Sequence, residues 1–130
     1  MISVLVALGG GLGAVARFAV DGALAERNRS GFPLGTAAVN LTGSFLIGLL
    51  LVWVAGYEGT AIAEPVYAAL GTGFLGGYTT FSTSSVEGVR LMSEGHWFGG
   101  IGHALGILIV CYLAALFGIM VGIVVAFEFG

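Results

Sequence analysis

The chain has 130 residues, of which 58% are hydrophobic and only 8% are charged. Soluble domains usually carry about 25% charged residues, and a compact domain of this size has too little interior to hide so much apolar surface. The composition therefore excludes an ordinary soluble domain and indicates a single membrane domain. The formal net charge is −3 and lysine is absent, so nucleic acid, which needs clustered cations, is not expected as a partner.

Four apolar segments follow one another, each long enough to cross the roughly 30 Å core of a bilayer as a helix. The expected spans are residues 2–25, 33–55, 65–92 and 97–127. Pro33 is well placed at a helix start. Arg17 interrupts the first segment and no positively charged stretch precedes it, which favours a retained span over a signal peptide. The predicted fold class is thus an all-α membrane protein with four transmembrane helices.

Many of the 24 glycines fall inside these spans. Three pairs are spaced four residues apart, a spacing at which small residues let helices approach closely in lipid: Gly9 and Gly13, Gly102 and Gly106, and Gly118 and Gly122. Packing is the simplest interpretation of these pairs. So many packing faces on so small a chain also indicate burial against a second subunit.

The positive charges gather at one end of the expected spans. Arg27, Arg29 and Arg90 lie in or beside the first and third loops, and Arg17 lies nearest the same end. The positive-inside rule then places these two loops in the cytoplasm and both termini outside, in a multi-pass protein of the cell membrane.

The centre of the third span, Gly71 to Ser85, is rich in glycine, threonine and serine. Paired glycines and β-branched threonines form helix poorly. A break at this depth is tolerated only where the freed backbone groups are buried in protein or line a polar cavity. The resulting helix ends offer N–H groups to an anion and C=O groups to a cation. The alternative is a kinked helix in which hydroxyl groups bond back to the chain.

Thr36, Asn40 and Ser44 are four residues apart in the second span, so they share one helical face. Asn40 either makes a hydrogen bond to another helix or lines a pore as a donor, and the spacing does not choose between these roles. Arg17 at least extends its charge to the cytoplasmic interface; an added role in drawing anions into a vestibule stays open.

No catalytic arrangement is recognisable, and the chain is not expected to be an enzyme. His96 and His103 have no cysteine or carboxylate at metal-ligand spacing, and the serines lack a nucleophile elbow or an evident base. The single cysteine, Cys111, cannot form an internal disulfide.

Three stretches carry a resemblance to a known family. They are GGLGAVARF at residues 10–18, PLGTAAVNLTGSF at 33–45 and GFLGGYTTFST at 73–83. In this order and spacing they resemble the CrcB/Fluc family of fluoride channels. The resemblance covers the first three spans closely, whereas the fourth matches only in length and apolar character. It implies a fluoride-selective channel through which cytoplasmic fluoride leaves passively, which reduces fluoride toxicity.

The resemblance also implies an assembly and roles for particular residues. The family forms an antiparallel dimer with two pores and a broken third helix. Asn40 would line the fluoride path as an amide donor, and Phe81 would turn the partially positive edge of its ring toward the ion. Thr80, Ser82 and Thr83 match the polar path, and Arg17 and Glu87 match vestibule positions. A sodium ion at the dimer centre would be held by carbonyls of Gly76 and Thr79 from both subunits.

The sequence departs from the family pattern at Ser84, where a second phenylalanine is usual. The Ser84 hydroxyl either replaces a ring edge as a donor in the fluoride path, or leaves one pore impaired. The charge bias is a second departure, since a protein that inserts both ways round needs balanced loops. It suggests the hypothesis that an oppositely oriented paralogue, instead of a second copy of the chain, completes the dimer.

Two other functions compete with a fluoride channel. One is a non-conducting structural partner in a heterodimeric channel. The other is a small multidrug-type exporter, which needs a carboxylate in mid-membrane. Asp21 and Glu87 lie toward the ends of their spans, which speaks against the exporter.

Overall fold

The computed structural model describes residues 1–28 and 34–129. The helices are α1 (Ile2–Arg27), α2 (Leu34–Ala55), α3 (Ala63–Val66), the π-helix η1 (Tyr67–Leu75), α4 (Gly76–Tyr78), α5 (Phe81–Ser93) and α6 (Trp97–Phe129). No strand occurs among these described residues, which confirms the prediction of an all-α chain. Pro33, the expected start of the second span, and Arg29 in the first loop lie outside the described residues.

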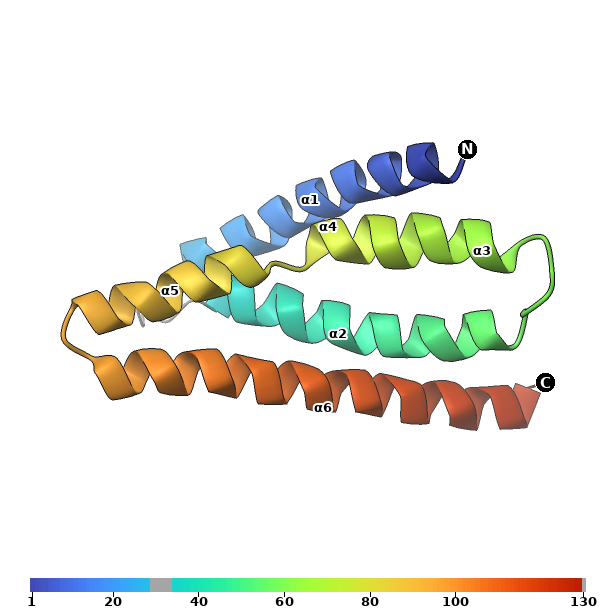
Figure 1. Cartoon of the computed structure of the whole chain (residues 1–130). Helices are drawn as coiled ribbons and strands as arrows, with labels where there is room; N and C mark the ends of the chain where they lie inside the picture. Colours follow the sequence, from blue (N-terminus) through green and yellow to red (C-terminus); the bar gives the residue numbers. More distant parts are fainter. Residues whose placement is uncertain (29–33, 130) are drawn as a thin grey trace.

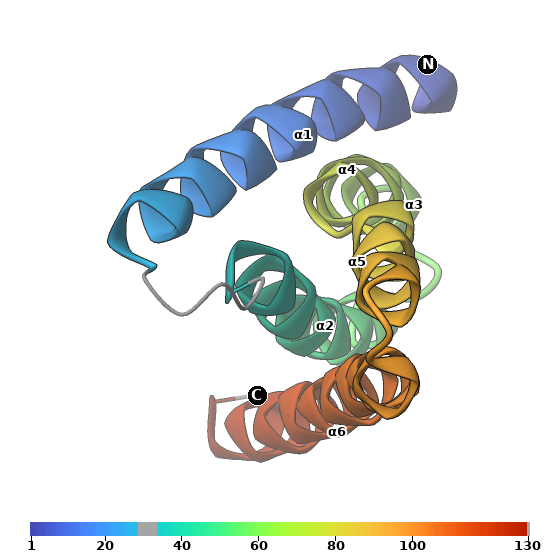
Figure 2. The same ribbon diagram turned by 90° about the vertical axis from the view of Figure 1, so that its left-hand side faces the viewer.

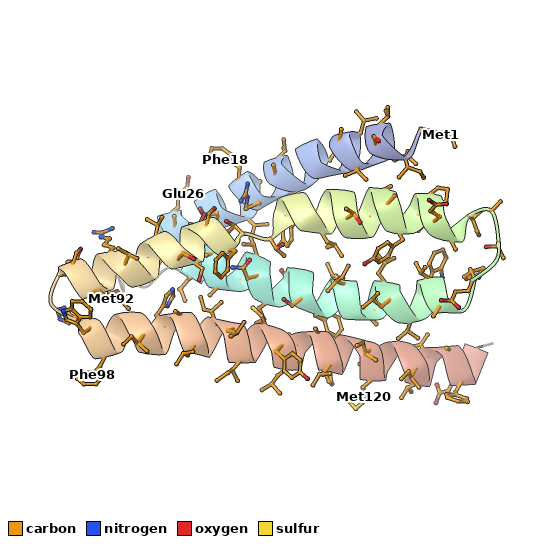
Figure 3. All side chains as sticks on the ribbon, viewed as in Figure 1. Met1, Phe18, Glu26, Met92, Phe98 and Met120 are labelled. Carbon is orange, nitrogen blue, oxygen red and sulfur yellow. The ribbon has the colours of Figure 1, made fainter. Side chains whose placement is uncertain are left out.

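Three of the helices, α1, α2 and α6, are long and apolar enough to cross a membrane. Their side chains face outward to an unusual extent: Leu8 and Leu108 are each 63% exposed, whereas Val39 is fully buried. Phe18, Phe98 and Met120 point away from the neighbouring helices (Figure 3). Apolar surface of this extent is stable in lipid and not in water, so the chain is a membrane protein.

The helices lie side by side, and the two ends of the chain are at the same end of the molecule (Figure 1). Viewed from the opposite end, α2 lies between α1 and α6, and α4 and α5 lie to one side of it (Figure 2). This end contains the C-terminal ends of α1 and α5 and the N-terminal ends of α2 and α6. The segment from Ala63 to Ser93 lies beside the three long helices and consists of the shorter helices α3, η1, α4 and α5.

Three members of the glycine pairs bring helix backbones together within the chain. A side chain at Gly9 would collide with the Ala69 carbonyl, and one at Gly13 with the Phe74 carbonyl. Gly118 lies in the same way against the Phe45 carbonyl. The third pair, Gly102 and Gly106, faces open space. α1 therefore packs tightly on η1 and α4, and α6 packs tightly on α2.

The helical run is interrupted at Thr79 and Thr80. α4 ends at Tyr78, and both threonines are extended, with φ −79° and ψ 161° at Thr79 and φ −147° and ψ 122° at Thr80. Thr80 then caps α5, since its Oγ1 accepts a hydrogen bond from the Thr83 N–H at 3.2 Å. A side-chain oxygen in this position satisfies one of the free N–H groups of a helix start. The helix thus stops after Tyr78 and starts again at Phe81.

Candidate functional site

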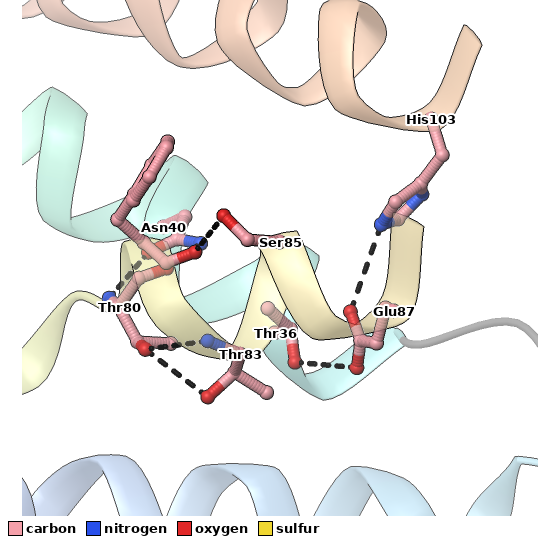
Figure 4. A network of polar contacts seen from close by, with 8 residues as sticks. Thr36, Asn40, Thr80, Thr83, Ser85, Glu87 and His103 are labelled. Atoms are coloured by element: carbon pink, nitrogen blue, oxygen red, sulfur yellow. Dashed lines mark hydrogen bonds and ion pairs between the residues drawn. The ribbon is translucent and has the colours of Figure 1, made fainter. Parts of the chain in front are cut away.

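Asn40 of α2 lies against the interruption between α4 and α5. Its Nδ2 donates a hydrogen bond to the Thr80 carbonyl at 2.8 Å, and its Oδ1 accepts one from the Thr80 N–H at 2.7 Å (Figure 4). Both residues are 8% exposed. Of the two roles left open for Asn40, the hydrogen bond to another helix is thus present. An amide has two N–H hydrogens, so one remains to be donated elsewhere.

This contact diverts the hydrogen bonds that would continue the helix. In an α-helix the Thr80 N–H would bond to the Gly76 carbonyl and the Thr83 N–H to the Thr79 carbonyl. Here the first N–H bonds to Asn40 and the second to the Thr80 hydroxyl. The carbonyls of Gly76 and Thr79 are therefore released from α-helical pairing, and both residues line one cavity.

Hydroxyl groups also bond back to the chain on either side of the interruption. The Thr79 hydroxyl donates to the Leu75 carbonyl at 2.9 Å, and the Ser85 hydroxyl donates to the Phe81 carbonyl at 2.9 Å. The alternative structure expected for this segment was a kinked helix whose hydroxyls bond back to the chain. It describes only the helical turns on either side of the interruption. At Thr79 and Thr80 themselves the backbone is extended and is held by Asn40.

The cavity beside Gly76 and Thr79 has a volume of about 440 Å³ and lies between α2, η1, α5 and α6. Its polar side is formed by Asn40, Ser44, Thr79, Thr80, Ser84 and Ser85, and its far wall by apolar residues of α6 such as Leu108. Ser84 is buried, at 7% exposed, whereas Phe81 at the rim is 87% exposed. The Phe81 ring thus projects out of the single chain.

A second cavity, of about 480 Å³, faces α1 and is more polar. Arg17 and Asp21 line it together with Thr36, Thr80, Ser82 and Thr83. Within it the Thr80 Oγ1 donates to the Thr83 Oγ1 at 3.1 Å and lies 3.3 Å from the Ser82 Oγ. The residues expected to form one fluoride path are therefore divided between two cavities, and Thr80 lines both.

Glu87 takes part in a contact that the sequence analysis missed. The Thr36 Oγ1 donates to Glu87 Oε1 at 3.0 Å, and His103 Nε2 lies 3.6 Å from Glu87 Oε2 (Figure 4). His103 was considered only as a metal ligand, and no group of three metal-ligating side chains occurs among the described residues. The short turn between α5 and α6 is a sequence signal for this contact. Glu87 and His103 lie nearly the same number of residues from the turn, so the two antiparallel helices bring them side by side.

Residues 4–119 match the model of the family described as CrcB-like protein, Camphor Resistance (CrcB). The chain belongs to the CrcB-like family. The match reaches far into α6, so it extends beyond the three stretches from which the resemblance was predicted.

Several CrcB-like relatives are similar over nearly their whole length. "Fluoride-specific ion channel FluC 1" of Leifsonia xyli subsp. xyli is 43% identical over 94% of this chain and 87% of its own. "Fluoride-specific ion channel FluC" of Opitutus terrae is 38% identical, covering 87% and 86%. "Fluoride-specific ion channel FluC 2" of Cutibacterium acnes is 42% identical, covering 94% and 98%. These names describe channels and not enzymes, and they confirm the predicted resemblance.

Proposed function

We propose that this CrcB-like chain is a subunit of a fluoride-selective channel that lets cytoplasmic fluoride leave the cell passively. The observation that carries the proposal is the Asn40–Thr80 contact, which holds an interrupted helix beside a cavity with fixed donors. The names of the relatives support the choice of ion. Fluoride binds water strongly, so its path must replace that water with donors that are already in place.

The proposed donors lie on both sides of the interruption. Asn40, which keeps a second Nδ2 hydrogen, and Ser84 line one cavity, and Ser82 and Thr83 line the other. Thr80 connects the two cavities. The exposed ring of Phe81 would present its partially positive edge to the ion. A larger halide would fit these closely spaced donors less well and would gain less from each of them.

We further propose that η1, α4 and α5 together form the third, interrupted transmembrane span. Their position beside three apolar helices supports this. So does the pairing of both Thr80 backbone groups with Asn40, since an unpaired N–H or C=O at mid-membrane depth costs several kcal/mol.

The exposed Phe81 ring and the open face at Gly102 and Gly106 support completion of the pore by a second chain in an antiparallel dimer. Arg27 and Arg90 favour a single orientation in the plasma membrane, with the first and third loops cytoplasmic. We therefore retain the hypothesis that the second chain is an oppositely oriented paralogue. Co-expression of chains with tagged termini tests it, and finding this chain alone in both orientations would favour a homodimer.

The carbonyls of Gly76 and Thr79 fit a sodium ion at the dimer centre. Their α-helical donors are diverted, and both residues line the same cavity. Carbonyl oxygens are suitable ligands for a small hard cation, and two chains would supply four of them. When bound, the ion would hold the two interrupted helices together.

The decisive experiment is fluoride efflux from liposomes that contain the purified chain. A channel releases fluoride quickly and leaves chloride behind. Absence of flux with the chain alone, restored by a paralogue, would show that the paralogue is required. Restored flux that Asn40→Ala and Phe81→Ala in this chain leave unchanged would then indicate the non-conducting partner. Proton-coupled efflux of a cationic drug without fluoride flux would indicate the small multidrug-type exporter.

A further inference from the structure

Glu87 and His103 come from neighbouring helices, α5 and α6, and meet near the end of the molecule that carries the first and third loops (Figure 4). The His103 side chain is 3% exposed and that of Glu87 is 24% exposed. Glu87 is held on its other oxygen by Thr36 at 3.0 Å. The His103 Nε2–Glu87 Oε2 distance of 3.6 Å exceeds that of an ordinary hydrogen bond, and the two groups form an ion pair only when His103 carries a proton.

The charges around this pair come from each helix packed against Glu87. Asp21 of α1 lies close enough to interact electrostatically with Glu87. Thr36 of α2 connects Glu87 to the cavity in which Arg17 and Asp21 also lie. On α5 itself, Arg90 is paired with Glu94 at 3.0 Å and is 77% exposed. With His103 neutral, the two carboxylates outweigh the Arg17 guanidinium by one charge.

We propose that Glu87 and His103 form a proton-binding site. It sets the charge beside the cavity lined by Arg17, Asp21 and Thr36, and it makes fluoride conduction faster at lower pH. The proposal rests on the proposed channel function. Histidine is the side chain that ordinarily changes charge between about pH 5 and pH 8. A proton on His103 cancels the excess negative charge, and any proton on Glu87 acts in the same direction. Because fluoride is an anion, fewer negative charges near its path favour its entry.

The chain offers a matched control for this site. Its only other histidine, His96, is exposed in the turn before α6, where its Nδ1 lies 3.2 Å from the Glu94 carbonyl oxygen. His96→Gln removes an imidazole without changing the pair. His103→Gln removes the titrating group of the pair, and Glu87→Gln removes its carboxylate charge while keeping an acceptor for Thr36.

The test measures fluoride efflux from liposomes at about pH 5.5 and about pH 7.5, on either side of the middle of the imidazole range. Protein-free liposomes at each pH correct for HF, which crosses lipid unaided. Wild-type efflux should be roughly fivefold to tenfold faster at the lower pH, the effect of one charge across about 10 Å of partly hydrated protein. His96→Gln should behave as wild type, His103→Gln should lose the dependence, and Glu87→Gln should conduct faster at the higher pH. Equal wild-type rates, or an unchanged profile in His103→Gln, would overturn the proposal.

A second measurement does not depend on conduction. In nanodiscs of the His96→Gln chain, the ¹⁵N signals of His103 should differ between the two pH values of the efflux test, and Glu87→Gln should alter that difference. Signals that stay constant, or that do not respond to Glu87→Gln, would overturn the proton site. Absence of flux at every pH with normal titration would instead contradict the proposed channel function.

Discussion

Asn40 and Thr80, forty residues apart, bond to each other in both directions: amide to carbonyl at 2.8 Å and backbone N–H to amide oxygen at 2.7 Å. The Asn40 amide oxygen thus takes the place of the Gly76 carbonyl as partner of the Thr80 N–H, and its Nδ2 adds a donor to the Thr80 carbonyl. Because both bonds are buried, water cannot replace them if the side chain is removed. The interruption therefore depends on one residue of another helix.

Asn40→Ala is expected to destabilise the chain and abolish fluoride efflux. The buried Thr80 N–H loses its partner, at a cost of about 1–3 kcal/mol, and the Thr80 carbonyl loses the Asn40 donor. Asn40→Asp keeps an acceptor for the Thr80 N–H, but its second oxygen meets the Thr80 carbonyl oxygen, and it brings a buried negative charge to the cavity. It should also be destabilised and should also fail to conduct. Thermal unfolding and liposome efflux measure the two effects, and wild-type flux in either variant contradicts the pore assignment.

Phe81→Ala should abolish efflux while leaving the stability of the chain nearly unchanged. The ring is 87% exposed, so the chain itself loses little packing when it is removed. Phe98, 94% exposed near the start of α6, provides the matched control. Phe98→Ala should conduct as wild type, and equal losses in the two variants would show that Phe81 has no special role.

The helices could be predicted from the sequence because lipid imposes a length and an apolar composition that are easy to recognise. The weak point in the third segment was also predictable, since Gly76, Gly77 and the following threonines disfavour helix. The extended residues at Thr79 and Thr80 lie at this weak point, where Asn40 of α2 holds them.

Contacts between helices were harder to predict. Asn40 was known to share a face with Thr36, yet nothing local shows that its amide reaches the backbone of Thr80. The separation of Ser82 and Thr83 from Ser84 into different cavities depends on which neighbouring helix each side of α5 faces. The contact between His103 and Glu87 joins two helices across a short turn, and metal-ligand spacing gives no sign of it.

Ser84→Ala should slow efflux by roughly fivefold, the effect of losing one hydrogen bond of about 1 kcal/mol to the ion. Ser84 is buried and lines the cavity that also contains Asn40. The control is Ser93→Ala at the end of α5, where the hydroxyl is exposed and donates to the Arg90 carbonyl at 2.8 Å. An unchanged rate in Ser84→Ala would mean that this hydroxyl does not replace a phenylalanine edge as a donor.

Gly13→Ala should destabilise the chain by about 1–3 kcal/mol, as overpacking commonly does. The added methyl group would meet the Phe74 carbonyl and would lie 2.8 Å from the Tyr78 nitrogen, which forces α1 away from η1 and α4. Gly11→Ala is the matched control, because a Cβ there meets no atom within 4 Å. Unfolding in mixed micelles compares the two. Equal stabilities would show that the close approach of α1 is not required.

Replacing sodium with a large organic cation during purification and reconstitution should weaken the proposed dimer. The proposed ligands are the main-chain carbonyls of Gly76 and Thr79, so no side-chain substitution would remove them directly. Thr79→Ala therefore serves as the control: it loses the 2.9 Å bond from its hydroxyl to the Leu75 carbonyl but keeps its own carbonyl. The fraction of dimer, counted by single-molecule photobleaching in lipid, should fall without sodium in both wild type and Thr79→Ala.

If only Thr79→Ala loses its dimers, the hydroxyl stabilises the interruption. If neither responds to sodium, the two carbonyls do not hold an ion, and contacts between the helices alone must account for the assembly.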